Sequence, residues 1–148
     1  MNRSEKRRQR KKAGIAKAKT PALQQSLDRA IQHHQAGDLP QAEGIYHQIL
    51  QTDPNQPVAL HLLGVIAHQV GKNDIAVDLI GKALAVNPDF AEAHGNLGVS
   101  LMDLGRPEDA VTSFRKALVL KPDYAEAHNN LGNALKELGD LDDTNLQK

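Results

Sequence analysis

A single period of 34 residues runs through the sequence and limits what the chain can fold into. Shifted by that period, residues 89–105 (DFAEAHGNLGVSLMDLG) match residues 123–139 (DYAEAHNNLGNALKELG) at eleven of seventeen positions. The same shift superimposes three further sets of residues, which are Gly37, Gly71, Gly105 and Gly139; Ala42, Ala76 and Ala110; and Pro54, Pro88 and Pro122. A constant period in the range of about 20–50 residues indicates stacked units that each pack on their neighbours.

Each 34-residue unit contains two stretches with apolar residues at helical spacing. Gly71 and Gly105 follow the first stretch, where the residue after a helix often needs a positive φ. The second stretch stops before a proline, because the residue that precedes a proline disfavours the α region. Pro107 suits a helix start, since its missing N–H is not needed there. We therefore predict helices at 22–36, 39–52, 57–70, 73–86, 91–104, 107–120 and 125–138.

Three glycines, Gly64, Gly98 and Gly132, recur in the middle of the first helix of a unit. A glycine inside a helix costs about 1 kcal/mol relative to alanine, so its repetition needs a reason. We interpret these positions as sites where the second helix of the unit approaches closely. Ala76 and Ala110 are the small residues expected on that facing helix.

The pattern resembles the tetratricopeptide repeat family over about residues 23–141, with a signature of the form aromatic-x2-Leu-Gly-x2-aromatic, Ala-x3-Phe, Pro. The matching residues are Leu60, Leu63, Gly64, Ala67, Ala76, Ile80 and Pro88; His94, Leu97, Gly98, Leu101, Ala110, Phe114 and Pro122; and His128, Leu131, Gly132 and Leu135. The first unit keeps Ala42, Tyr46 and Pro54, but Arg29-Ala30 replaces Leu-Gly.

This resemblance implies an all-α fold: a right-handed superhelical solenoid of antiparallel helix pairs with about 3.5 repeats. The expected segments are a basic disordered tail at 1–21, a degenerate repeat at 22–56, complete repeats at 57–90 and 91–124, and a partial repeat at 125–148. The second helix of the last repeat would fall near 141–154, and helix 125–138 would leave Leu131, Leu135 and Leu138 uncovered. Either the chain is a piece of a longer array, or another copy or a partner covers that helix.

In this family the first helix of each repeat lines the concave face, which implies a set of binding residues. Positions i, i+4, i+7 and i+11 of those helices are Gln24, Asp28, Ile31 and Gln35; Val58, Leu62, Val65 and Gln69; Glu92, Asn96, Val99 and Asp103; and Glu126, Asn130, Asn133 and Glu137. The candidate peptide-binding residues among them are Leu62, Val65, Glu92, Asn96, Val99, Asp103, Glu126, Asn130, Asn133 and Glu137.

Two chemical hypotheses concern this face. Asn96 and Asn130 lie one period apart, and their amides can pair with the backbone of an extended peptide. The alternative is that both are polar consensus residues with no ligand. Four acidic candidates predict a preference for basic, extended peptides: Glu92, Asp103, Glu126 and Glu137. The alternative is an acidic face that is simply solvated.

The stretches AEAHGNLG and AEAHNNLG are similar to the repeats that precede the catalytic domain of O-linked N-acetylglucosamine transferases, in which asparagine ladders hold substrate peptides. They also resemble bacterial proteins that join such repeats to a sulfotransferase domain. We therefore expect a non-catalytic adaptor or scaffold that binds a protein or an extended peptide. The alternative is the substrate-recognition part of such a glycosyltransferase or sulfotransferase.

The sequence offers no chemistry of its own for catalysis. It has no cysteine, no glycine-rich phosphate loop and no HExxH pattern, so we expect no metal, no cofactor and structural roles for the seven histidines. No stretch approaches the roughly 18 apolar residues of a membrane span, and we expect a cytoplasmic protein.

Charge is distributed unevenly along the chain. Residues 1–20 carry nine Lys/Arg and one acid, whereas the rest carries nine Lys/Arg and seventeen acids. Such a tail can bind nucleic acid or an anionic surface, although no aromatic residues are interleaved for base stacking. It can also serve solubility alone, or fold onto the acidic concave face and compete with ligand.

Overall fold

The structure, a computed structural model, describes Arg3 and residues 18–146, with side chains described through Asp140. The predicted tail thus lies mostly outside the described residues. Seven helices and no strand occur within residues 18–146. They are α2 (Pro21–Gln35), α3 (Leu39–Thr52), α4 (Pro57–Gln69), α5 (Asn73–Val86), α6 (Ala91–Asp103), α7 (Pro107–Leu120) and α8 (Ala125–Leu146). The bounds of the first six agree with the sequence prediction to within one residue.

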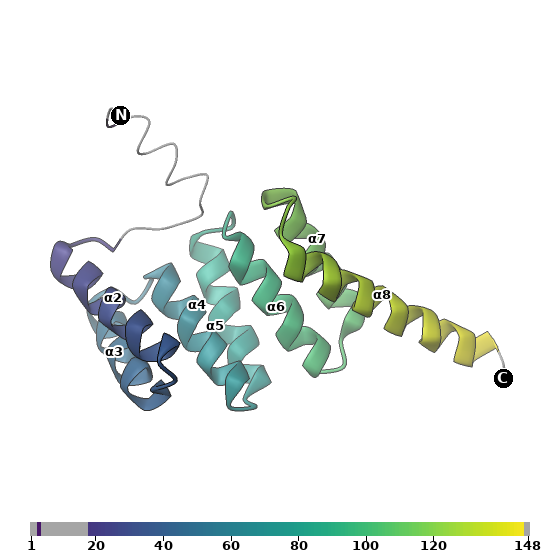
Figure 1. The fold of residues 1–148 in the computed structure, drawn as a ribbon, viewed down its shortest axis with the longest axis horizontal. Helices are drawn as coiled ribbons and strands as arrows, with labels where there is room; N and C mark the ends of the chain where they lie inside the picture. Colours follow the sequence, from purple (N-terminus) through teal and green to yellow (C-terminus); the bar gives the residue numbers. More distant parts are fainter. Residues whose placement is uncertain (1–2, 4–17, 147–148) are drawn as a thin grey trace.

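The helices stand side by side in one continuous row from α2 to α8 (Figure 1). Helices α2 and α3, α4 and α5, and α6 and α7 pack as pairs, and each pair also packs on the next. Helix α6 contacts both α4 and α8, whereas no comparable contact joins α3 with α5 or α5 with α7. First helices therefore approach each other more closely than second helices do, and they form the inner side of the array. The all-α fold of antiparallel helix pairs is confirmed.

The turn between the two helices of a unit is built in the same way three times. Gly37, Gly71 and Gly105 have φ of 81°, 83° and 72°, a region that glycine adopts without a Cβ clash. In the second unit the Gly71 N–H donates to the His68 carbonyl (3.0 Å), and the Lys72 N–H donates to the Ala67 carbonyl (2.8 Å). These bonds satisfy carbonyl groups that a helix end leaves free. The predicted glycine turns are confirmed.

The last helix departs from the prediction. We expected it to end at residue 138, with Gly139 in the position of the turn glycines, but α8 continues through Gly139 to Leu146. Gly37, Gly71 and Gly105 are each followed by a second helix that packs back on the first, and no such helix follows α8 in the described residues. Without that packing, Gly139 stays helical, a conformation that glycine also adopts.

Two of the three mid-helix glycines are contact points between paired helices. A Cβ at Gly64 would lie 2.7 Å from Cγ1 of Ile80 and 3.3 Å from the Ala76 carbonyl oxygen. A Cβ at Gly98 would lie 2.7 Å from Cδ1 of Phe114, inside the van der Waals surface of the ring. The space beside Gly132 is open. The close-approach interpretation is confirmed for the first two glycines, whereas none of the described helices packs in that position beside Gly132.

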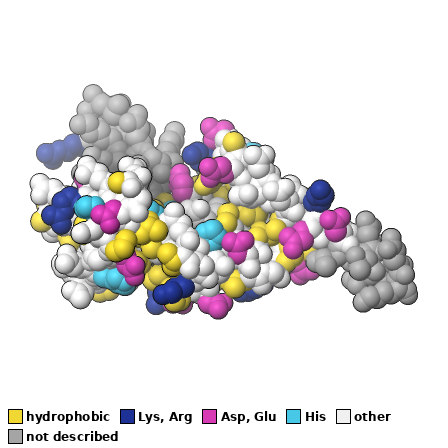
Figure 2. Space-filling model, turned by 60° about the horizontal axis from the view of Figure 1, so that its bottom comes forward, with side chains coloured by type: hydrophobic (Ala, Val, Ile, Leu, Met, Phe, Trp, Pro, Cys, Tyr) yellow, Lys and Arg dark blue, Asp and Glu magenta, His cyan; other side chains and the backbone are white. Residues whose placement is uncertain are grey.

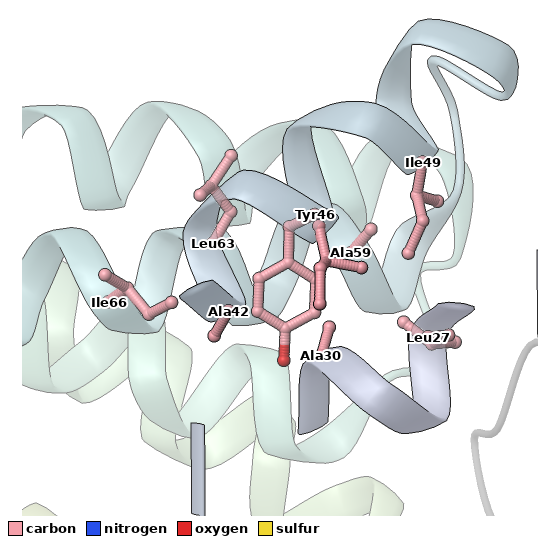
Figure 3. Close-up of a cluster of buried hydrophobic side chains, with 9 residues drawn as sticks. Leu27, Ala30, Ala42, Tyr46, Ile49, Ala59, Leu63 and Ile66 are labelled. Carbon is pink, nitrogen blue, oxygen red and sulfur yellow. The ribbon is translucent and has the colours of Figure 1, made fainter. Parts of the chain in front are cut away.

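One large side chain anchors each of the first three units. Tyr46, Ile80 and Phe114 are equivalent in the repeat, and each is fully buried. In the first unit Tyr46 lies between the small residues Ala30, Ala42 and Ala59, as Figure 3 shows. Alanines on the neighbouring helices leave room for one bulky residue per unit. The fold therefore needs few aromatic side chains, in agreement with the 3% in the sequence.

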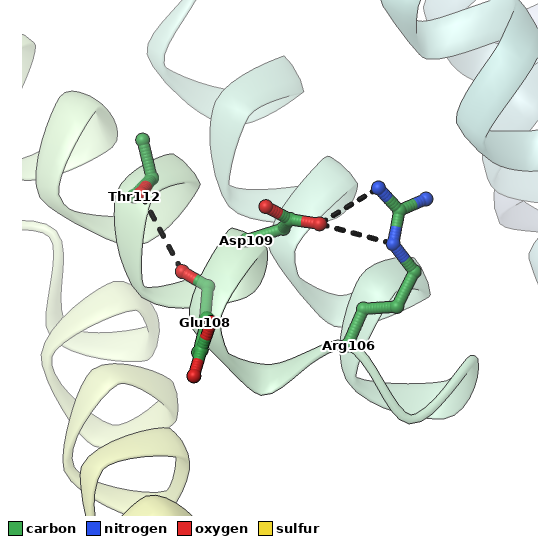
Figure 4. A network of polar contacts seen from close by, with 4 residues as sticks. All are labelled: Arg106, Glu108, Asp109 and Thr112. Atoms are coloured by element: carbon green, nitrogen blue, oxygen red, sulfur yellow. Dashed lines mark hydrogen bonds and ion pairs between the residues drawn. The ribbon is translucent and has the colours of Figure 1, made fainter.

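The entry to α7 is held by short-range polar contacts. Pro107 occupies the first turn of the helix, as predicted. Nε and Nη2 of Arg106 both donate to Oδ2 of Asp109, at 3.0 and 2.7 Å, and the Thr112 hydroxyl donates to the Glu108 carbonyl (Figure 4). Since these groups are exposed, the Arg106–Asp109 ion pair contributes at most about 1 kcal/mol. They orient the turn rather than stabilise the array.

Candidate functional site

The first helices α2, α4, α6 and α8 form a surface that we call the inner face. All sixteen residues predicted to lie on it are partly or fully exposed, whereas the buried residues of these helices fall at other positions. Figure 2 shows acidic side chains among apolar and histidine side chains over one face of the array. The spacing i, i+4, i+7 and i+11 in the first helices therefore selected residues that are accessible to solvent.

The inner face is apolar toward its N-terminal half. Ile31, Val58 and Leu62 are half-buried and pack against the core cluster around Tyr46. Val65 is also half-buried, and Val99 packs against the cluster that contains Phe114. These side chains belong partly to the core and present only part of their surface to a ligand.

Polar side chains connect the first helices of neighbouring units at a constant separation. The His34 Nε2 donates to Gln69 Oε1 at 2.8 Å, and the His68 Nε2 donates to Asp103 Oδ2 at 2.6 Å. Each pair joins residues 35 positions apart, which is one period plus one residue. We call such a pair a rung. The candidate residue Asp103 is thus engaged in a rung.

A further rung involves the candidate residue Asn96. Its amide Nδ2 donates to Nε2 of the buried His61 at 2.8 Å, again over 35 positions. The His61 ring also meets Phe90 edge-on, with centroids 4.7 Å apart. Burial, with a smaller effect of His34, lowers the pKa of His61 to about 4, so the imidazole is neutral at pH 7. One of the two N–H groups of Asn96 is therefore used inside the protein.

The remaining polar candidate of α6 is also engaged. Glu92 Oε1 lies 3.6 Å from Lys121 Nζ, and the Lys121 ammonium lies 5.0 Å from the centre of the Tyr124 ring. Burial raises the pKa of Tyr124, and the nearby carboxylates of Glu126 and Glu92 raise it further. All three polar candidates of α6 thus serve contacts within the array.

The candidates on α8 differ from those on α6. Glu126, Asn133 and Glu137 are exposed and Asn130 is half-buried. None of the four makes a hydrogen bond or an ion pair with a residue that the structure describes. Unengaged polar groups on the inner face are therefore concentrated on its last helix.

Two equivalent histidines have a structural role that the sequence only partly revealed. The Nε2 of His94 donates to the Pro88 carbonyl and that of His128 to the Pro122 carbonyl, both at 2.8 Å. Each bond ties a first helix to the proline turn before it. The sequence predicts structural roles for both residues, and the fold of the preceding turn determines which carbonyl each one contacts. Within the described residues, no three His, Asp or Glu are grouped to hold a metal ion.

The C-terminal leucines are only partly uncovered. Leu131 and Leu138 are half-buried and pack against the cluster around Phe114, so the expectation that both lack cover was wrong. Leu135 is 43% exposed, in agreement with that expectation. Helix α7 therefore covers most of the apolar side of α8.

Helix pairs of constant length, turn glycines and one buried anchor per unit define a helical-repeat array. A family model described as "Tetratricopeptide repeat" matches residues 33–97, and a second, described as "TPR repeat", matches residues 100–139. Together the two matches span most of the described helices. The chain belongs to the tetratricopeptide repeat family.

Solved structures share this fold. An O-GlcNAc transferase of Thermobaculum terrenum is 34% identical over 82% of this chain, with a TM-score of 0.76, and the chain spans 23% of that protein. The first TPR of Spaghetti (RPAP3), bound to the HSP90 peptide SRMEEVD, is 21% identical over 79% of this chain and 93% of its own, with a TM-score of 0.75. The Sgt2 TPR domain of Aspergillus fumigatus is 17% identical over 84% of each chain, with a TM-score of 0.79. No curated protein sequence matched significantly.

The chain is thus a tetratricopeptide repeat domain, a fold typical of protein-interaction modules. None of the described helices has both the length and the apolar character that a membrane crossing requires. The cytoplasmic location stays a prediction.

Proposed function

We propose that the inner face binds an extended, basic segment of another protein, and that the chain acts as an adaptor without catalysis. The observation that carries this proposal is the set of unengaged polar side chains on α8, Glu126, Asn130, Asn133 and Glu137. Carboxylates and amides that form no hydrogen bond or ion pair with the described residues are available to charged and backbone groups of a ligand.

Charge decides which peptide class suits this face. The two acids of α8, Glu126 and Glu137, are exposed without a paired cation in the described part of the chain, and Asp28 on α2 is exposed as well. The peptide in the related RPAP3 structure is acidic in its last residues, SRMEEVD. A peptide of that charge would be repelled by the carboxylates of this inner face. A basic peptide is attracted by them.

Neutralising the two acids of α8 should weaken binding of a basic peptide. For the double variant Glu126→Gln, Glu137→Gln, we expect a fluorescein-labelled Lys/Arg-rich peptide to bind about 3- to 10-fold more weakly, since each exposed charge pair contributes up to about 1 kcal/mol. Fluorescence anisotropy at low and at moderate salt measures this, because screening should reduce the difference.

The matched control removes two exposed acids from second helices, Glu108→Gln with Asp74→Asn. It changes net charge equally but leaves the inner face intact, so affinity should stay within about twofold of the unmodified chain. A Glu-rich peptide should bind more weakly than the basic one to all three proteins. Equal weak binding of both peptides to the unmodified chain would contradict the proposal.

The asparagines allow a separate prediction about backbone recognition. Asn130→Ala should weaken binding of a basic peptide about fivefold, the effect of losing one or two hydrogen bonds of about 1 kcal/mol net. Asn129→Ala is the control, because this exposed neighbour points about 100° away around the helix. Titration calorimetry compares the two, and equal affinities would count against an amide contact. Asn96→Ala is less informative, since it also removes the partner of His61.

A second function has a specific observation in its favour. The transferase of Thermobaculum terrenum is similar to this chain over a region that is only 23% of its own length. The same repeats in this chain suit a substrate-recognition part of a glycosyltransferase or sulfotransferase. Sequencing the genomic region that follows the codon for Lys148 tests this alternative, because a transferase reading frame in phase would support it.

Other partners stay predictions. Self-association through α8 would cover the exposed Leu135 and the open space beside Gly132. A role of residues 1–19 toward nucleic acid, an anionic surface or the inner face concerns positions that lie mostly outside the described residues. Within the described part, Lys19 lies 3.5 Å from the carboxylate of Asp53.

A further inference from the structure

The rungs between first helices form a series that stops before the last unit. His34 with Gln69 joins α2 to α4, and two rungs, His61 with Asn96 and His68 with Asp103, join α4 to α6. Adding one period of 34 to the residue numbers of the two α4–α6 rungs gives the equivalent pairs, Gly95 with Asn130 and Met102 with Glu137. These two pairs would join α6 to α8, which are in contact. Neither pair can form the hydrogen bond of its predecessor.

The Met102–Glu137 position lacks a donor. Histidine at the equivalent place in α4 donates to a carboxylate at 2.6 Å. The thioether of Met102 has no N–H or O–H, so the Glu137 carboxylate keeps its acceptor capacity for solvent or for a ligand. Glu137 is exposed, whereas Met102 is half-buried. By equivalence with His68 and Asp103, the repeat places the apolar Met102 side chain next to Glu137.

The Gly95–Asn130 position lacks an entire side chain. In the preceding unit the His61 imidazole both packs on Phe90 and pairs with Asn96. Here Tyr124 takes the place of Phe90, and its ring lies so close to Gly95 that a Cβ there would meet it at 3.2 Å. Asn130 is left half-buried without a hydrogen bond to the described residues. Its amide offers donors and an acceptor at the contact line between α6 and α8.

We propose that a bound peptide supplies the two missing rungs, with a lysine or arginine to Glu137 and an amide or hydroxyl side chain to Asn130. This inference rests on the proposed function and specifies where the peptide lies and which residues it carries. Asn130 and Glu137 are two helical turns apart, about 10.5 Å along α8. A peptide in the extended polyproline II conformation advances about 9.3 Å in three residues. Because that helix has three residues per turn, side chains three positions apart lie on the same side of the peptide and can both face α8. The ligand is therefore an extended segment along the α6–α8 contact line, with a polar residue and a basic residue three positions apart.

The decisive variant completes one rung inside the protein. Met102→His places an imidazole where His68 lies one unit earlier, so that it pairs with Glu137 and competes with the ligand. We expect about fivefold weaker binding of a peptide with the required spacing, and an unchanged or higher midpoint of thermal unfolding. The matched control is Met102→Leu, which keeps the apolar surface, adds no donor and should leave the affinity unchanged.

The probe is a pair of capped peptides of identical composition. In Gly-Gln-Gly-Gly-Arg-Gly the glutamine and the arginine are three positions apart, and in Gly-Gln-Gly-Arg-Gly-Gly they are two apart. Titration of the ¹⁵N-labelled full chain, followed by amide shifts in α6 and α8, gives both affinities. We expect the first peptide to bind at least threefold more tightly and to shift the amides near Asn130 and Glu137 most.

The outcomes separate this inference from the proposed function. Equal binding of both peptides, or no loss on Met102→His, overturns the rung inference even if Lys/Arg-rich peptides still bind the inner face. If Met102→His fails to fold, Glu137→Gln replaces it as an exposed variant that should abolish the preference between the two peptides. A preference that survives this change overturns the inference. Absence of any amide shift at millimolar peptide also overturns it.

Discussion

Replacing Phe114 with alanine should lower the free energy of unfolding by about 3–5 kcal/mol, the range for truncation of a buried phenylalanine. The ring is fully buried and forms the centre of a cluster with Leu101, Val111 and Ala134. It also fills the space beside Gly98. Because α6, α7 and α8 all meet at this cluster, the cavity cannot close without moving one of them. Urea unfolding at pH 7, followed by helical circular dichroism, measures the change.

A nearby residue provides the control for this experiment. Val119 is on the same helix but is 81% exposed, so Val119→Ala should change stability by less than about 0.5 kcal/mol. If Phe114→Ala cost no more than this control, the packing of α7 between α6 and α8 described above would be incorrect.

Acidification should destabilise the fold through His61. Burial lowers its pKa from 6.5 to about 4, so the folded protein holds this imidazole neutral while the unfolded chain takes up a proton. Above pH 6.5 the His61 imidazole is neutral in both the folded and the unfolded state. His61 therefore does not make the free energy of unfolding depend on pH there. As pH falls from 6.5 toward 4, the unfolded state is increasingly favoured, by about 3 kcal/mol in total. The unfolding free energy should therefore fall through this pH window.

A comparison of variants isolates the contribution of His61 from that of the carboxylates. His61→Phe cannot titrate, so its stability should depend less on pH between 6.5 and 4 than that of the unmodified chain. His47→Gln is the control, since His47 is exposed and its 3.7 Å contact with the equally exposed Glu43 contributes at most about 1 kcal/mol. Its pH profile should be parallel to that of the unmodified chain. Parallel profiles for both variants would show that His61 is not held neutral by burial.

The helices were predictable because each depends on signals a few residues long. Turn glycines such as Gly71, prolines such as Pro107 and apolar spacing act locally, and their recurrence every 34 residues made each assignment support the next. Gly139 shows the limit of this reasoning. The residues before it resemble those before Gly105, but Asp140-Leu141 follow it where Arg106-Pro107 follow Gly105. Gly139 is helical, and no second helix packs behind it in the described residues.

The inner face was predictable in its exposure but not in its contacts. Helical spacing placed Asn96 and Asp103 on the surface, and both are there. Their engagement with His61 and His68 depends on how neighbouring units are offset, which a search within one helix does not reveal. A signal was present in the sequence, since complementary polar residues recur 35 positions apart, one more than the repeat. A comparison of residues 34 positions apart does not detect this 35-residue separation.

The uneven distribution of side-chain hydrogen bonds between the first helices also affects where the array begins to unfold. In a linear stack, each unit is stabilised by its own helices and by the interface with the next. Two cross-helix hydrogen bonds join α4 to α6, whereas the described residues provide none of this kind between α6 and α8. Unfolding that proceeds from one end should therefore start at α8 and meet greater resistance at α6. Helix α8 also carries the unengaged polar groups. A bound peptide would therefore stabilise this helix more than the others.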